Sequence, residues 1–175
     1  QADREFYALV QAGAYNEARS FIGAFQLGLY NLMPRAHDQL GPSQIGLVNV
    51  VESFTSMALG QIGLLNVMAG RGQAWATVQL GLVNWTHGFL GLVQAGVLNL
   101  SEGTGALLQL ALVNHDAGEV GLAQVGVVNR AGTVVGLQLG LVNIAGTLRG
   151  VQIGLVNVAR RGGWSPVSPI LNVSL

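Results

Sequence analysis

Apolar and polar residues alternate in a short pattern that recurs ten times along the chain. Each copy reads Gln-x-Gly-x-x-Asn, and Ala111 is the one residue that replaces the Gly. The residues one and three positions after Gln are apolar in every copy, and the fourth is Val, Leu or Tyr. A period of two is that of a β-strand and not of a helix. The pattern therefore predicts an all-β chain in which each copy forms a strand and each connector a loop.

The spacing of the copies favours a β-solenoid. Successive Gln residues are 14 to 18 residues apart, so the motif is fixed and the connectors absorb the variation. If each copy is one coil, identical residues stack at about 4.8 Å and their amides hydrogen-bond from coil to coil. The expected ladder residues are Gln79, Gln94, Gln109, Gln124, Gln138, Gln152, Asn84, Asn99, Asn114, Asn129, Asn143, Asn157, Gly81, Gly96, Gly126, Gly140 and Gly154.

The alternation also predicts which side chains face outward. One coil has room for two short strands, for instance 137–143 and 147–149. Gln, Gly and Val at positions zero, two and four would form a flat, uncharged outer strip that another copy, a partner protein or lipid covers. The side chains expected to point inward are Leu137, Leu139, Leu141, Ile144 and Leu148.

Two membrane-spanning alternatives exist. In an antiparallel transmembrane β-barrel each copy would be one strand, and residues 167–175 do alternate like a closing strand. However, neighbouring barrel strands run in opposite directions, and this geometry does not require the same directional motif in each strand. Residues 72–101 lack charge and could cross a bilayer as a helix, but each of their glycines would cost that helix about 1 kcal/mol. The solenoid, with about ten coils, is favoured.

Length and composition indicate one repeat domain over 1–175, with repeats in 11–162 and a closing segment in 163–175. Only 9% of the residues are charged and the formal net charge is zero, which disfavours a nucleic-acid partner. The absence of Cys excludes disulfides and thiolate chemistry. A first residue of Gln1 instead of Met fits an exported product whose signal peptide has been removed.

Two of the repeats resemble a known class of proteins. The segments 136–145 and 150–159 resemble bacterial surface-repeat proteins built of GLQxGLxN units, and the ending 163–175 is similar to the ending of short exported members. The Gln-x-Gly-x-x-Asn core is also similar to the curlin repeat, although curlin units are longer. The resemblance implies a cell-surface or outer-membrane location and a structural role without known catalysis.

Candidate catalytic and metal-binding residues do not form a recognisable constellation. His37, His87 and His115 lie eleven, eight and six residues after their Gln, so they do not stack. We predict no enzyme activity, no metal and no cofactor, with a homo-oligomer, an envelope protein or lipid as partner. Arg130 and Arg149 lie near Arg160 and Arg161 and could line one edge of the last coils, and the units of Tyr15 and Tyr30, with their long connectors, make the N-terminal half the expected recognition end.

Overall fold

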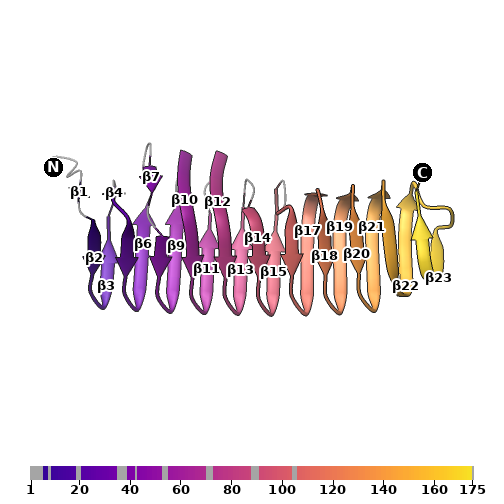
Figure 1. Ribbon diagram of the computed structural model, residues 1–175, viewed down its shortest axis with the longest axis horizontal. Coiled ribbons are helices and arrows are strands. Elements are labelled where there is room, and N and C mark those ends of the chain that lie inside the picture. Colours follow the sequence, from indigo (N-terminus) through magenta and orange to yellow (C-terminus); the bar gives the residue numbers. More distant parts are fainter. Residues whose placement is uncertain are drawn as a thin grey trace.

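The protein is a straight β-solenoid. The computed structural model describes residues 6–7, 9–18, 21–34, 39–41, 43–52, 55–69, 73–87, 91–103 and 106–174. The coils follow one another along a single axis in chain order (Figure 1). Successive coils pair in parallel and in register, with Gln79 opposite Gln94 and Asn84 opposite Asn99. Of the architectures that the repeat permitted, the solenoid is the one observed.

Two strands make up each regular coil, one with the motif Gln and one with the motif Asn. The Gln strands are β2 (Val10–Ala12), β5 (Phe25–Leu27), β8 (Ser43–Ile45), β10 (Thr55–Ile62), β12 (Gln73–Leu80), β14 (Gly91–Ala95), β16 (Leu108–Leu110), β18 (Ala123–Val125) and β20 (Leu137–Leu139). The Asn strands are β3 (Tyr15–Glu17), β6 (Tyr30–Pro34), β9 (Val48–Glu52), β11 (Leu65–Met68), β13 (Val83–Thr86), β15 (Leu98–Ser101), β17 (Val113–Val120), β19 (Val128–Val134) and β21 (Val142–Leu148). The last coil is β22 (Val151–Arg161), and short strands β1 (Phe6–Tyr7), β4 (Phe21–Ile22) and β7 (Gln39–Gly41) lie in the early connectors.

A tight turn lies inside the motif. Gln138 is in β20 and Asn143 in β21, and the chain bends between them at Gly140 and Leu141. The prediction of one strand over 137–143 was therefore wrong. Gln and Asn are five residues apart, an odd number, so a straight strand would place them on opposite faces. The bend resets the alternation and turns both side chains inward.

The apolar core is small. One cluster of buried apolar side chains lies in the C-terminal coils and a second in the N-terminal coils, and the first contains Val120, Val134 and Leu148. Most of the remaining interior of the described residues is occupied by the motif Gln and Asn, which expose at most 2% of their surface from Asn16 and Gln26 onward. Polar amides therefore replace most of the apolar core that a domain of this size usually has.

Most of the apolar side chains expected inside lie outside. Of the five residues predicted to point inward, only Leu148 is buried; Leu137 and Ile144 are half-buried. Leu139 and Leu141 expose 41% and 51% of their surface. The prediction was wrong for these residues because it assigned the interior to the aliphatic positions, whereas the amides occupy it.

An antiparallel strand covers the last coil. β23 (Val167–Val173), within the predicted closing segment 163–175, pairs antiparallel with β22. The Asn172 amide donates to Oε1 of Gln152 (3.4 Å) and to the carbonyl of Ser165 (2.9 Å). Pro169 in β23 has no N–H to offer a further strand, and an edge of this kind resists addition of another sheet. This end of the rod is therefore closed.

Glycine is required in the turn for space and not for backbone conformation. Among the described glycines only Gly162 has a left-handed φ, of 91°. A Cβ on Gly140 would overlap the carbonyl oxygen of Gly126 and lie 2.6 Å from Nδ2 of Asn129. The backbone of the previous coil and its Asn amide occupy the space that a side chain at this position would need.

Ala111 is the one residue that replaces the motif glycine, and the hydrogen bonds around it differ from those in the other coils. Asn99 lies in the preceding coil, and its Nδ2 is 3.3 Å from the carbonyl of Leu110, against 2.8 to 3.1 Å at the equivalent positions. Asn99 also donates to the carbonyl of Gln94 at 3.1 Å, a bond that the other ladder Asn residues do not make in the described chain. The extra methyl group thus coincides with a displaced amide.

We expect Gly140→Ala to destabilise the rod, because its Cβ overlaps the backbone of the coil below. Overpacking of this kind costs about 1–3 kcal/mol, equivalent to a decrease in melting temperature of roughly 3–10 °C for a chain of this length. Gly13→Ala is the matched control, since the nearest atoms to its Cβ are Asn16 Oδ1 at 3.1 Å and Tyr15 O at 3.4 Å, both in its own coil. Thermal unfolding followed by circular dichroism measures both; equal shifts would refute the steric explanation.

Candidate functional site

The motif glutamines form a continuous hydrogen-bonded ladder inside the rod. Nε2 of each Gln donates to Oε1 of the Gln in the preceding coil, at 2.6 to 2.8 Å, from Gln152 down to Gln11. Buried polar groups are costly unless they are bonded. Stacking of identical amides meets that requirement, since each supplies the donor that its neighbour lacks.

The motif asparagines form a second ladder that runs in the opposite direction. Nδ2 of each Asn donates to Oδ1 of the Asn in the following coil, at 2.8 to 2.9 Å, from Asn16 up to Asn157. The second Nδ2 proton is donated to the carbonyl one residue after the next Gln, for example from Asn143 to Ile153 at 2.9 Å. The stacking predicted for Gln and Asn is thus present, and the donors of the two ladders point in opposite directions along the rod.

The predicted outer strip of Gln, Gly and Val does not exist. The Gln residues from Gln26 to Gln152 expose at most 2% of their surface. They cannot be an interaction surface, because their polar atoms are already bonded within the rod. The outer surface is formed instead by the aliphatic motif positions, for example by the exposed residues Leu139 and Leu141.

Rows of exposed aliphatic side chains run along the rod. The row one residue after Gln lies on the outer surface of the Gln strands, which we call the A-face; its Leu and Ile residues expose 38–47%. The row three residues after Gln lies on the turn, which we call the turn edge, and its Leu residues expose 49–67%. The A-face row with these exposures is Leu27, Ile45, Ile62, Leu80, Leu110, Leu139 and Ile153, and the turn-edge row is Leu29, Leu47, Leu64, Leu82, Leu112, Leu141 and Leu155.

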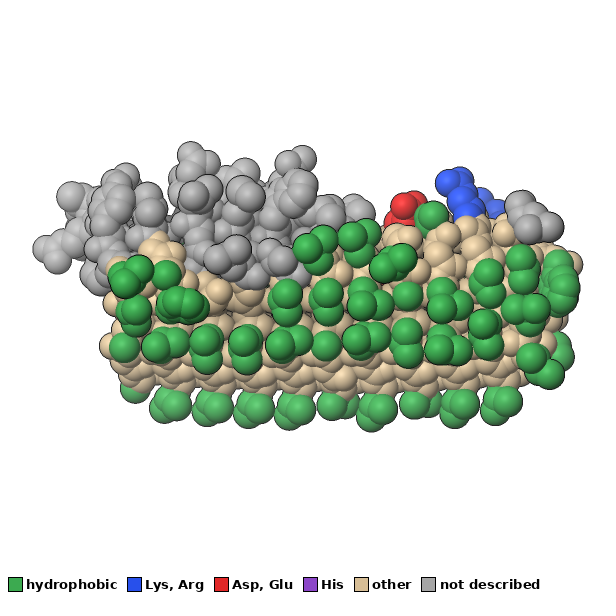
Figure 2. Space-filling model, viewed as in Figure 1, with side chains coloured by type: hydrophobic (Ala, Val, Ile, Leu, Met, Phe, Trp, Pro, Cys, Tyr) green, Lys and Arg blue, Asp and Glu red, His purple; other side chains and the backbone are tan. Residues whose placement is uncertain are grey.

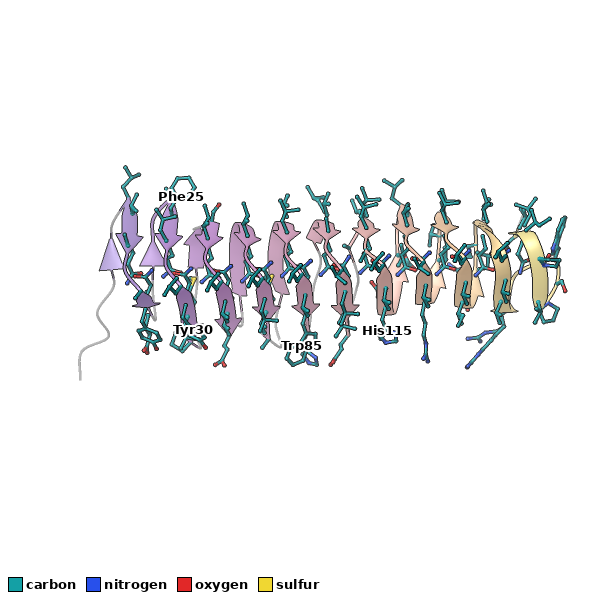
Figure 3. The ribbon with its side chains drawn as sticks, turned by 90° about the horizontal axis from the view of Figure 1, so that it is seen from below. Phe25, Tyr30, Trp85 and His115 are labelled. Atoms are coloured by element: carbon teal, nitrogen blue, oxygen red, sulfur yellow. The ribbon has the colours of Figure 1, made fainter. Side chains whose placement is uncertain are left out.

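The two broad faces differ in charge. Figure 3 looks onto the turn edge from below. It shows Phe25 on the A-face and Tyr30, Trp85 and His115 on the opposite side, which we call the B-face. Figure 2 shows rows of hydrophobic side chains and no charged ones along the middle of one face and along the turn edge. Charged side chains in that view lie only at the edge opposite the turn. The A-face and turn edge together form an uncharged apolar surface, which is the candidate functional site.

Polar side chains on the B-face form one cluster across two coils. Nδ1 of His87 lies 2.8 Å from Oε2 of Glu102, and Nε1 of Trp85 donates to Oε1 of Glu102 at 3.2 Å. The hydrogen bond from His87, with a further one from Trp85, lowers the pKa of Glu102. In the described part of the chain, no group of three or more His, Asp or Glu is placed to hold a metal ion. His37 lies outside the described residues.

The remaining predicted features have mixed outcomes. Arg130, Arg149, Arg160 and Arg161 are all exposed. Tyr15 and Tyr30 stack with ring centroids 5.6 Å apart and an interplanar angle of 10°. Parts of the long N-terminal connectors, which were expected to form a recognition end, lie outside the described residues, namely 35–38, 42, 53–54 and 70–72.

A third position of each coil also points inward, and the sequence reasoning missed that polar residues replace apolar ones there in three coils. Two residues after the motif Asn the inward side chain is apolar in most coils, but Thr86, Ser101 and Asp116 occupy this position in three successive coils. Thr86 Oγ1 donates to Oε1 of Gln79 at 3.0 Å and accepts from Nε2 of Gln94 at 2.9 Å. The signal available in the sequence was a polar residue at an otherwise apolar position.

Asp116 is a buried carboxylic acid at a strand irregularity. Its exposure is 1%, Oδ1 accepts from the backbone N–H of Gly118 at 2.8 Å, and the pairing of β17 with β19 shifts register between Asp116 and Glu119. Burial raises the pKa of Asp116 from an ordinary 3.8 to about 7, against the lowering effect of bonds from Gly118 and Ser101. The neutral acid is therefore the form that the interior favours.

Comparison with protein-family models, with curated proteins and with solved structures finds no match to this chain. Within the described residues, no helix is long and apolar enough to cross a membrane.

We expect the rod to lose stability as pH rises from about 4 to about 7. Because the pKa of Asp116 is higher in the folded than in the unfolded chain, its stabilising contribution is complete below the unfolded pKa of about 3.9 and is lost as pH rises to the folded value. The change is on the order of a few kcal/mol. Melting temperatures at pH 4.5 and pH 8 measure it.

Two variants make this test specific. Asp116→Asn keeps the size of the side chain and removes the titratable carboxyl group. The melting temperature of this variant should therefore change less between the two pH values than that of the unmodified chain. Glu119→Gln removes an exposed carboxylate in the same strand and should leave the pH dependence as it is. An unaltered pH dependence in Asp116→Asn would show that another group is responsible.

Proposed function

We propose that this chain is a non-catalytic structural repeat protein of the bacterial cell envelope. In this proposal it is exported, is held at the cell surface or outer membrane, and uses its uncharged apolar surface for self-association or for attachment to a partner protein or membrane. The surface involved is the A-face with the turn edge, in place of the Gln-Gly-Val strip expected from the sequence.

The observation that carries the proposal is the length of the exposed apolar rows. Leu29 near one end and Leu155 near the other expose 59% and 67% of their surface, with an aliphatic residue at the same position in each intervening coil. Monomeric soluble proteins seldom expose contiguous apolar patches of more than a few hundred Å². A surface of this extent is expected to be covered where the protein works.

A further observation supports a structural role. The polar side chains that recur in each coil are bonded to one another inside the rod, so they stabilise the fold and are not presented to a substrate. The location rests on the resemblance of residues 136–145 and 150–159 to GLQxGLxN surface repeats.

We expect the purified chain to bind to bacterial envelope fractions and to stay bound through high-salt and carbonate washes, because apolar contact is insensitive to ionic strength. The double variant Leu141→Gln with Leu155→Gln, in the turn edge, should reduce the bound fraction roughly tenfold. Arg130→Gln, an exposed change on the B-face, is the control and should bind as the unmodified chain does. Quantitative sedimentation with immunoblotting measures the bound fraction; a chain that stays wholly in the supernatant contradicts the proposal.

A further inference from the structure

The A-face has the properties of one half of a dry interface. Its central row, one residue after Gln, is aliphatic in all coils, and a second row one residue before Gln contains only apolar residues, Gly60 and Ser43. Phe25 and Leu27 of these two rows expose 43% and 38%. None of the eight acidic or eight basic residues of the chain occupies either row or the turn-edge row.

The A-face is also flat and regular. Successive Gln strands pair without register shifts, as in β16 with β18 and β18 with β20, and the rod is straight (Figure 1). Its side chains therefore repeat at the strand spacing of about 4.8 Å. The surface that best matches a row with this repeat is another row with the same repeat, and sheets packed in this way interdigitate about 10 Å apart.

The area is sufficient for a stable pair. Ten coils at about 4.8 Å give a length near 50 Å, and the rows from one residue before Gln to the turn span roughly 15 Å. The flat projection is on the order of 700 Å², and the relief of the side chains increases the accessible area. Stable complexes bury about 800 Å² on each partner.

Charge favours a second copy over a lipid bilayer as the occupant. Surfaces that lie on anionic membranes combine an apolar face with flanking basic residues. This chain has no Lys, and none of its Arg residues is in the A-face or turn-edge rows: Arg130 lies in the Asn strand β19, and Arg160 and Arg161 end β22, beyond its Asn157. The B-face is unsuited to a dry interface because it carries exposed charges such as Glu17, Glu52 and Glu102.

We propose that a second copy of this chain covers the A-face, with the two rods antiparallel. A two-fold axis along the strand direction reverses the rod and keeps both turn edges on the same side, so that aliphatic rows face aliphatic rows. An axis along the rod would instead place the turn edge of one copy against the charged connectors of the other. This inference rests on the proposed function and specifies what covers the A-face.

Near the centre of this antiparallel arrangement with full overlap, large side chains face small ones. The coil of Gln79 then faces the coil of Gln94 in the other copy, which sets Leu80 opposite Ala95. In the outer row, Gly60 lies opposite Leu108. Elsewhere in the central row, aliphatic residues of similar size face each other, as Leu27 and Leu139 do, so close packing there requires the two rows to interdigitate.

Mass measurement in solution tests the pairing. Light scattering or sedimentation equilibrium of the purified chain should give twice its 18.2 kDa mass. Leu110→Glu on the A-face should weaken the pair roughly 100-fold or more, because it buries an unpaired carboxylate. Val113→Glu in the same coil is the matched control: both side chains expose 38%, but Val113 lies in the Asn strand β17 and its variant should stay dimeric.

Cysteine cross-linking tests the direction, since the chain has no Cys of its own. A mixture of Leu27→Cys and Leu139→Cys should form the mixed cross-linked dimer with a short bifunctional thiol reagent, and neither variant alone should do so. Cross-links within each single variant would overturn the antiparallel arrangement. Circular dichroism verifies that each variant is folded.

The outcomes separate this inference from the proposed function. A monomer at high micromolar concentration that still binds envelope fractions would overturn the dimer and leave the proposed function standing. A monomer that floats with phosphatidylglycerol vesicles would identify lipid as the occupant and likewise overturn the dimer. A dimer that does not bind envelope fractions would support the inference and contradict the envelope attachment.

Discussion

The hydrogen bond between identical amides in successive coils is the interaction on which the rest of this structure depends. An amide inside a protein must find both a donor and an acceptor, and unsatisfied groups cost about 1–3 kcal/mol each. Gln109 and Asn114 satisfy this condition by bonding to their own copies above and below. Because that solution requires exact repetition, it fixes the register of each coil against the next.

The two ladders determine where the other residues go. The amides occupy the interior, so glycine must stand where the turn passes close to them, and Ala111 coincides with a displaced Asn99. The aliphatic side chains that a domain usually buries are displaced to the A-face and turn edge. The exposed apolar surface, and with it the proposed association, is thus a consequence of a polar interior.

Much of the fold could be predicted because the repeat is strict. The spacing of Gln and Asn predicted both the solenoid and the stacking, but the orientation was wrong: hydrophobicity suggested that Leu139 and Leu141 were inside. The odd separation of Gln138 and Asn143 could have revealed the turn, since two inward residues five positions apart need a bend. Asp116 was missed because its raised pKa results from burial, which the residue type alone does not reveal.

The sequence by itself determined that the chain is built of ten like β units, and it favoured stacked coils because in-register stacking gives the ten Gln and ten Asn residues equal surroundings. The tertiary structure decided which face of each strand is inside. Which face is inside depends on the free energy gained by burying aliphatic groups relative to that gained by pairing all the amides. The amides are paired only once the neighbouring coils are in place. Hydrophobic pattern within one repeat carries no information about partners that the next repeat supplies.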